Sequence, residues 1–78
     1  MLIKVLGSGC SKCHKLEENV RQAIQLCGID ARVEKVTDLQ AIMRYGVMST
    51  PALVVDEVVR STGRILSPAD IVKLISKR

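Results

Sequence analysis

The chain has 78 residues, of which 47% are hydrophobic, but it contains no Phe or Trp and only a single Tyr. Its formal charge is +4, and the twelve Lys and Arg residues are spread along the sequence without a dense basic run. Because unpaired bases usually stack on aromatic side chains, this composition argues against nucleic-acid binding. No apolar run is long enough to span a membrane. A chain of this length predicts a single domain, residues 1–78, with a thin aliphatic core.

The first half of the chain predicts a strand, a helix and a second strand. Residues 2–6 (LIKVL) form an apolar run that ends in a glycine-rich turn, which predicts a buried strand. From Cys10 or Ser11 onward, apolar residues recur at spacings of three and four, which predicts an amphipathic helix that stops at Gly28. Apolar and polar residues then alternate over residues 29–36 and predict a half-buried strand.

A second, shorter helix is predicted after this strand. TDLQ, at residues 37–40, matches a capping box with Thr37 as the N-cap. Leu39, Ile42 and Met43 follow at helical spacing and are expected to form its apolar face.

The last part of the chain predicts a hairpin and a third helix. Residues 52–55 and 58–61 are strand-like and flank Asp56-Glu57. Two-residue turns favour Gly or Asn, so this loop is expected to be wider than two residues. Ser67 and Pro68 then open a helix as N-cap and first helical residue. The predicted order is β-α-β-α-β-β-α, which is an α/β fold.

Cys10 and Cys13 form a C-x-x-C motif at the start of the first helix. At a helix N-terminus the backbone N–H groups and the helix dipole stabilise a thiolate and lower the pKa of the thiol, which favours Cys10 as a nucleophile. Cys13 lies one turn further along, where a small local adjustment allows a disulfide with Cys10. The spacing therefore predicts Cys13 as the thiol that resolves a mixed disulfide formed by Cys10.

Two polar residues next to the motif and a third cysteine further along the helix also bear on its chemistry. Lys12 and His14 can favour the Cys10 thiolate electrostatically, although a partly exposed polar side chain is the simpler interpretation of His14. Cys27 follows Cys13 by fourteen residues, which is about 21 Å along an unbroken helix. It therefore cannot share a disulfide or a metal ion with the motif. An inert thiol buried on the core side of the helix is expected, with an intermolecular or regulatory role as the alternative.

The same cysteines leave metal and haem binding open. C-x-x-C-H matches the attachment site of a c-type haem, with Met43 or Met48 as a second axial ligand, but such a protein needs export. The opening MLIKVLGSG has no charged leader followed by a long apolar stretch, so a cytoplasmic location is expected instead. A closed zinc site that includes Cys27 is disfavoured because four ligands must converge on one ion.

Pro51, in VMSTPALVV, opens an apolar strand at a position where it cannot donate a ladder hydrogen bond. Together with the strand, C-x-x-C and helix, Thr50-Pro51 before a hairpin resembles the thioredoxin superfamily. The length and GSGCSKCHKLEENV resemble the small glutaredoxin-like and thioredoxin-like redox-active disulfide proteins of archaea and bacteria. The resemblance extends over essentially the whole chain. It implies a minimal thioredoxin fold, with a mixed four-stranded sheet flanked by three helices, and a cis Thr50–Pro51 peptide that packs against the disulfide and presents its backbone to the substrate.

The resemblance also implies the activity. It predicts a dithiol–disulfide oxidoreductase, a monomeric electron carrier that exchanges electrons with disulfide-bearing target proteins and needs no cofactor beyond the reversible Cys10–Cys13 disulfide. Two residues depart from the thioredoxin pattern: Gly9 stands in place of a tryptophan, and Lys4 in place of a buried acid. STGRILSP keeps only Gly63 of the residues that hold glutathione in glutaredoxins. A flavoprotein disulfide reductase, rather than glutathione, is therefore the expected reductant.

One alternative belongs to a different class of protein. VLGSGCSKC also resembles the heavy-metal-associated metallochaperone domains, in which C-x-x-C binds copper(I), a soft ion that thiolates suit. Those domains have the order β-α-β-β-α-β and a Met two residues before the first Cys. This chain has Ser8 at that position and a predicted helix where a hairpin is required.

Overall fold

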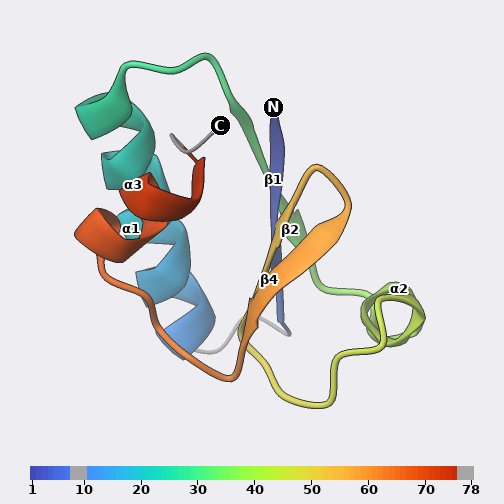
Figure 1. Cartoon of the computed structure of the whole chain (residues 1–78). Helices are drawn as coiled ribbons and strands as arrows, with labels where there is room; N and C mark the ends of the chain where they lie inside the picture. Colours follow the sequence, from blue (N-terminus) through green and yellow to red (C-terminus); the bar gives the residue numbers. More distant parts are fainter. Residues whose placement is uncertain (8–10, 76–78) are drawn as a thin grey trace.

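The computed structural model describes residues 1–7 and 11–75, and its elements follow the predicted order (Figure 1). The strands are β1 (Leu2–Leu6), β2 (Arg32–Val36), β3 (Ala52–Val55) and β4 (Val58–Thr62), and the helices are α1 (Ser11–Cys27), α2 (Leu39–Arg44) and α3 (Pro68–Ile75). A helix, α2, stands where the metallochaperone order requires a hairpin. The element order therefore contradicts the alternative fold.

The four strands form one mixed sheet with the order β2-β1-β3-β4. β1 pairs with β2 in parallel through the α1 crossover, whereas β3 pairs with β1 and β4 in antiparallel fashion. Helices α1 and α3 lie on one face of the sheet and α2 lies on the other (Figure 1). This is the minimal thioredoxin arrangement that the resemblance implies, and the structure confirms it.

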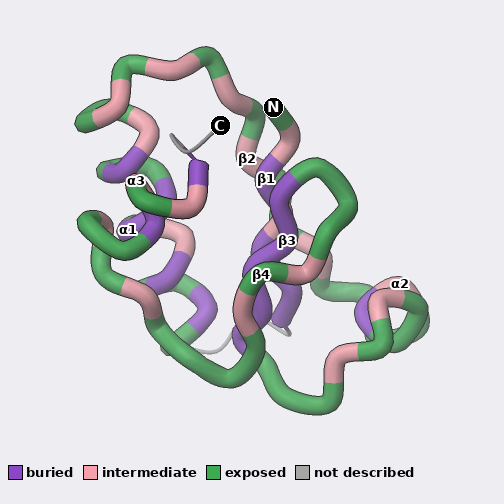
Figure 2. The backbone as a smooth tube through the Cα atoms, viewed as in Figure 1, coloured by how far each residue is buried: buried purple, intermediate pink, exposed green. Residues whose placement is uncertain are grey.

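The two faces of the sheet bury different amounts of apolar surface. Figure 2 shows the buried residues gathered on the central strands and on the helix sides that face them. The larger cluster lies between the sheet and α1 and α3, and comprises Ile3, Val5, Leu16, Val20, Ala23, Leu53, Val55, Ile71 and Ile75. The smaller cluster lies under α2 and comprises Leu6, Ile42, Ala52 and Val54. Most of the hydrophobic stabilisation therefore comes from the α1 and α3 face.

Helices α1 and α3 have the ends that the sequence predicts. Gly28 follows α1 with a φ of 69°, and its N–H donates to the Ile24 carbonyl at 2.9 Å. Ser67 caps α3, because its Oγ accepts a hydrogen bond from the Asp70 N–H at 3.2 Å. No helix in the described part of the chain is long and apolar enough to cross a membrane.

Helix α2 differs from the prediction at its start and on its apolar face. Its N-cap is Asp38 rather than Thr37, and no side-chain capping bond to a described residue is formed. Only Ile42 is buried, whereas Leu39 and Met43 are 68% and 64% exposed. The helix has six residues and makes less than two turns, so only one of its side chains, Ile42, is buried in the small cluster beneath it.

The prediction of a wide hairpin loop was wrong, because Asp56 and Glu57 alone form the turn. Val55 pairs with Val58, and both turn residues have positive φ, 50° and 68°. This conformation normally favours Gly or Asn. Here hydrogen bonds compensate: the Asp56 N–H donates to the Leu2 carbonyl at 2.8 Å, and its carboxylate accepts from the Leu2 N–H at 2.8 Å.

Two smaller differences concern β2 and Cys27. The strand begins at Arg32 rather than at residue 29, because its pairing partner β1 begins at Leu2, which lies opposite Arg32. Ile29 still packs against the larger cluster although it lies before the strand. Cys27 is half-buried at the end of α1 rather than fully buried, and it packs against the same cluster.

Candidate functional site

Cys13 lies in the first turn of α1 and packs against the end of β1. Its side chain is buried, with 4% of its surface exposed. A Cβ placed on Gly7 would overlap the Cys13 Sγ and would lie 3.3 Å from the Cys13 Cβ. Any side chain at position 7 would therefore collide with the thiol, which explains why a glycine ends the buried strand.

The segment before β3 approaches the same point. The position of a Cβ on Gly7 is 3.9 Å from the Thr50 Cβ, so Thr50 and Cys13 are neighbours across Gly7. The Thr50–Pro51 peptide bond is cis; Pro51 is buried while Thr50 is exposed. The structure thus brings together Cys13 from α1, Gly7 from the end of β1, and Thr50 from the loop before β3.

Gly63, immediately after β4, supports the Thr50-Pro51 segment from its other side. Its N–H donates to the Pro51 carbonyl at 2.8 Å, and its φ is 67°. A Cβ at this position would lie 3.0 Å from the Ser49 Cβ, closer than most such contacts. Gly63 therefore combines a left-handed backbone with a close approach to residues 49–51.

Of the other residues that the sequence analysis considered, some lie next to Cys13 and one lies far from it. Lys12 and His14 flank Cys13 on the first turn of α1, and both are exposed. Cys10 lies outside the described residues. Cys27 lies at the opposite end of α1 and does not join the site. Among residues 1–7 and 11–75, no three His, Cys, Asp or Glu side chains gather closely enough to hold a metal ion.

Sequence reasoning missed two supporting contacts at this end of the molecule. Asn19 is buried, and its Nδ2 donates to the Leu66 carbonyl at 2.8 Å, which ties α1 to the loop before α3. The contact between Gly7 and Cys13 was also missed. A glycine after an apolar strand is a signal of close approach, but the sequence does not tell which group approaches.

A hydrogen-bonded network of charged and polar groups lies on the α2 face of the sheet, around Lys4. The Lys4 Nζ donates to the Tyr45 hydroxyl at 2.7 Å and to the Glu57 carboxylate at 2.9 Å, and the Tyr45 hydroxyl donates to Glu57 at 2.7 Å. These bonds, first of all the one to Tyr45, raise the pKa of Lys4, and the Tyr45 hydroxyl lowers the pKa of Glu57. Lys4 thus fastens α2 to the hairpin turn.

Comparison with known proteins decides the family. A family model described as a thioredoxin domain matches residues 1–76. The chain belongs to the thioredoxin family. It is similar to a thioredoxin of Methanothermobacter thermautotrophicus, with 38% identity over 76 residues that cover 97% of this chain and 99% of the relative. It is also similar to a thioredoxin of Methanocaldococcus jannaschii, with 39% identity over 71 residues, 91% of this chain and 81% of the relative. As a thioredoxin family member, the chain is a thiol–disulfide oxidoreductase.

Proposed function

We propose that Cys10 and Cys13 form the redox pair of this oxidoreductase and reduce disulfides in target proteins. The Cys10 thiolate attacks one sulfur of the target disulfide, and the other target sulfur leaves as a thiolate that takes up a proton. The Cys13 thiolate then attacks the Cys10 sulfur of the mixed disulfide. This step forms the Cys10–Cys13 disulfide and releases the second target thiol, so that two electrons pass from the dithiol to the target.

The burial of Cys13 is the observation that supports Cys10 as the attacking thiol and Cys13 as the resolving thiol. With 4% of its surface exposed behind Gly7, the Cys13 sulfur is a poor first nucleophile for the disulfide of another protein. A thiol in that position suits the second, internal attack, which needs contact only with a neighbour three residues earlier in the chain. The first attack then belongs to Cys10.

Four further residues have supporting roles in this proposal. Lys12 and His14 are exposed beside Cys13 on α1, where positive charge favours a thiolate and lowers its pKa. Thr50 is exposed next to the buried Pro51, so the backbone of this segment is available to an extended substrate. The reaction needs no group other than the two thiols.

The proposal extends to the partners of the reaction. The substrates are disulfide-bearing proteins, and a flavoprotein disulfide reductase returns the electrons. Glutathione is not the expected reductant, because Gly63 is followed by Arg64 and Ile65 rather than by acidic residues. A cytoplasmic location fits this direction of electron flow, since thiols are kept reduced there. We propose that the protein works as a monomer.

Trapping of mixed disulfides tests the roles of the cysteines. Cys13→Ser removes the resolving thiol, so it is expected to accumulate a stable mixed disulfide with a disulfide-bearing protein, measured as an adduct by mass spectrometry. Cys10→Ser is expected to trap almost nothing. Cys27→Ser is the matched control and is expected to behave as the parent.

Two results would contradict the assignment. Equal trapping by both motif variants would show that neither thiol is the preferred nucleophile. Equal loss of copper(I) binding on substitution of Cys10 or Cys13, with no trapping by either variant, would instead favour a metal-binding role in which both cysteines are ligands.

A further inference from the structure

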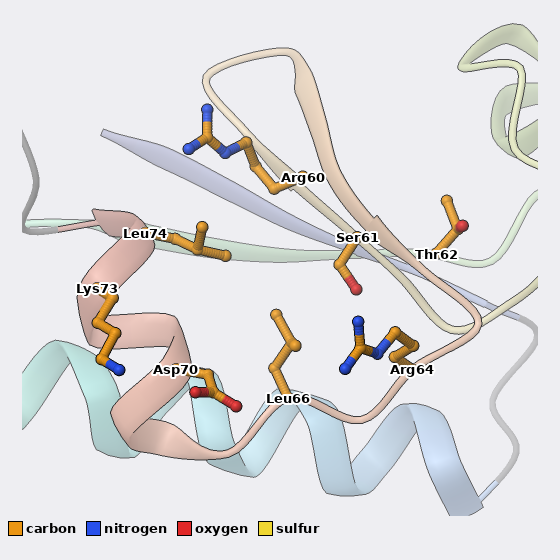
Figure 3. A pocket seen from close by; sticks show the side chains of 8 residues that line it. All are labelled: Arg60, Ser61, Thr62, Arg64, Leu66, Asp70, Lys73 and Leu74. Atoms are coloured by element: carbon orange, nitrogen blue, oxygen red, sulfur yellow. The ribbon is translucent and has the colours of Figure 1, made fainter.

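An open groove of about 590 Å³ lies between β4 and α3. Figure 3 shows the side chains that line it. They are Arg60, Ser61, Thr62, Arg64, Leu66, Asp70, Lys73 and Leu74. We refer to this feature as the basic groove. Leu66 and Leu74 form a half-buried apolar part of its lining, next to the half-buried Ser61, and the other lining residues form its rim and are polar and exposed.

The rim carries an excess of positive charge. Arg60, Arg64 and Lys73 are exposed, and among the described residues that line the groove only Asp70 is a carboxylate. Within the described part of the chain, none of the three cations forms an ion pair; the ion pairs that do form involve Lys4, Arg21, Arg32 and Lys35. The positive charge of the rim is therefore available to a partner.

A β-bulge turns part of β4 toward this groove. Leu53 pairs with Ser61 and Val54 pairs with Val59, so Arg60 is an extra residue in the strand. Bulges of this kind redirect side chains, and here both Arg60 and Ser61 line the groove. The Ser61 Oγ is buried and lacks a hydrogen-bond partner within the described residues. Figure 3 shows this hydroxyl pointing toward the Arg64 guanidinium.

The basic groove is linked to the Thr50-Pro51 segment through Gly63. Thr62 and Arg64 line the groove on either side of Gly63, whose N–H donates to the Pro51 carbonyl at 2.8 Å. Thr50, the residue before Pro51, is the neighbour of Cys13 across Gly7. The residues on either side of Gly63 thus line the groove, while Gly63 itself contacts the segment that lies next to Cys13.

We propose that the basic groove binds an acidic segment of the target protein next to its disulfide. Carboxylates of this segment pair with Arg60, Arg64 and Lys73, and an apolar side chain covers Leu66 and Leu74. The inference rests on the proposed function and narrows its substrate class to disulfides with acidic and apolar flanks.

The layout of the groove favours a polypeptide over a small anion or a nucleic acid. Figure 3 shows the three cations on different sides of the groove rather than converging on one point, which suits several carboxylates along a chain. A free phosphate has no apolar group that could cover Leu66 and Leu74, whereas a polypeptide side chain does. Among residues 1–7 and 11–75, no aromatic side chain lines the groove to provide a surface on which a base would stack.

The experiment compares two peptides that contain the same disulfide. One has Glu and Leu flanks, and the other has Gln and Leu flanks. We expect the parent protein to reduce the acidic peptide with the higher kcat/KM. The double variant Arg60→Glu/Lys73→Glu should lower kcat/KM for the acidic peptide by about fivefold or more, and for the neutral peptide by less than about twofold. The difference should shrink at about 1 M salt, because the charges are exposed.

A variant with the same change in net charge serves as the control. Arg32→Glu/Arg44→Glu alters two exposed cations on β2 and α2, away from the groove, and should leave the preference for the acidic peptide nearly unchanged. Thermal unfolding of both double variants verifies that they are folded. Equal effects of the two double variants would overturn the proposal, because they would show that only overall charge matters.

A binding measurement separates this inference from the proposed function. A copy of the acidic peptide with Ser in place of both Cys cannot react, and its dissociation constant is measured by calorimetry. Binding that the groove variant weakens and the control does not would support the groove even if no disulfide were reduced. Tighter binding of a single-stranded oligonucleotide, or competition by millimolar inorganic phosphate alone, would overturn the proposal in favour of a general anion site.

Discussion

The two ends of the sheet are built in opposite ways. At the end where β1 reaches Gly7 and β3 begins, backbone and small groups approach one another closely: Gly7 against Cys13, and Gly63 against Ser49 and Pro51. At the other end, where β3 turns into β4, long polar side chains bridge the elements through the network of Lys4, Tyr45 and Glu57.

The difference shows where each kind of interaction is useful. A thiol that must meet a neighbouring sulfur needs fixed surroundings, and close steric contact fixes position more strictly than exposed hydrogen bonds do. The hairpin turn only has to be held in place, and partly exposed charges are sufficient for that. We therefore expect substitutions at the reactive end to have larger effects than substitutions at the hairpin end.

Gly7→Ala is expected to have the largest effect. The added methyl group would overlap the Cys13 Sγ, so either α1 or the end of β1 must move. Overpacking of this kind costs about 2–3 kcal/mol of unfolding free energy, measured by urea denaturation. Reduction of a disulfide substrate should fall strongly in the same variant.

Gly28→Ala is the control for this substitution. Gly28 has no other described residue within 4 Å of its added Cβ, but its φ of 69° is unfavourable for alanine. It should lose about 1 kcal/mol and keep its redox activity. A Gly7→Ala protein as stable and as active as Gly28→Ala would show that the site tolerates an added side chain.

Gly63→Ala should have an intermediate effect. Alanine would be strained at a φ of 67°, and its Cβ would lie 3.0 Å from the Ser49 Cβ. A loss of about 1–2 kcal/mol is expected, together with a lower kcat/KM, because the hydrogen bond to Pro51 would shift. Gly46→Ala has a similar φ, 74°, without a nearby described atom, and should change stability but not kcat/KM. Equal kinetics of the two variants would argue that residues 49–51 do not depend on Gly63.

Glu57→Gln should have the smallest effect, visible mainly at low pH. The Tyr45 hydroxyl and the Lys4 ammonium lower the pKa of Glu57, so its contribution to stability is present above the ordinary pKa of a glutamate and is lost as the pH falls through its lowered value. The urea midpoint of the parent should therefore decrease more between about pH 6 and pH 3 than that of Glu57→Gln.

Glu18→Gln removes the same charge from an exposed position on α1 and provides the comparison for Glu57→Gln. Its urea midpoint should follow the parent across the whole pH range. An identical pH dependence in both variants would mean that the network around Lys4 adds nothing to stability.

The features that could be predicted from the sequence are those set by residues close together in the chain. The apolar stripe of α1, the cap at Ser67 and the glycine after α1 all depend on residues a few positions apart. The turn at Asp56 and Glu57 could not be predicted in this way. Its unusual backbone depends on Leu2, Lys4 and Tyr45, which are distant in sequence.

The candidate site was predictable to a similar degree. The motif and the resemblance point to Cys13 and to Thr50-Pro51, and the structure brings Cys13 and Thr50 together. The roles of Gly7 and Gly63 were not visible, because a glycine has no side chain that reveals its neighbour. The basic groove depends on the bulge at Arg60, which the alternation of strand residues does not indicate.

The order β2-β1-β3-β4 has a consequence for the behaviour of the protein in concentrated solution. It leaves two strands with one side unpaired, and such strands can recruit those of other molecules and start fibrils. On β2, Arg32, Glu34 and Lys35 are exposed and charged, and on β4 the bulge interrupts the regular ladder. Both features oppose edge-to-edge stacking, and we expect them to limit aggregation through the two edge strands.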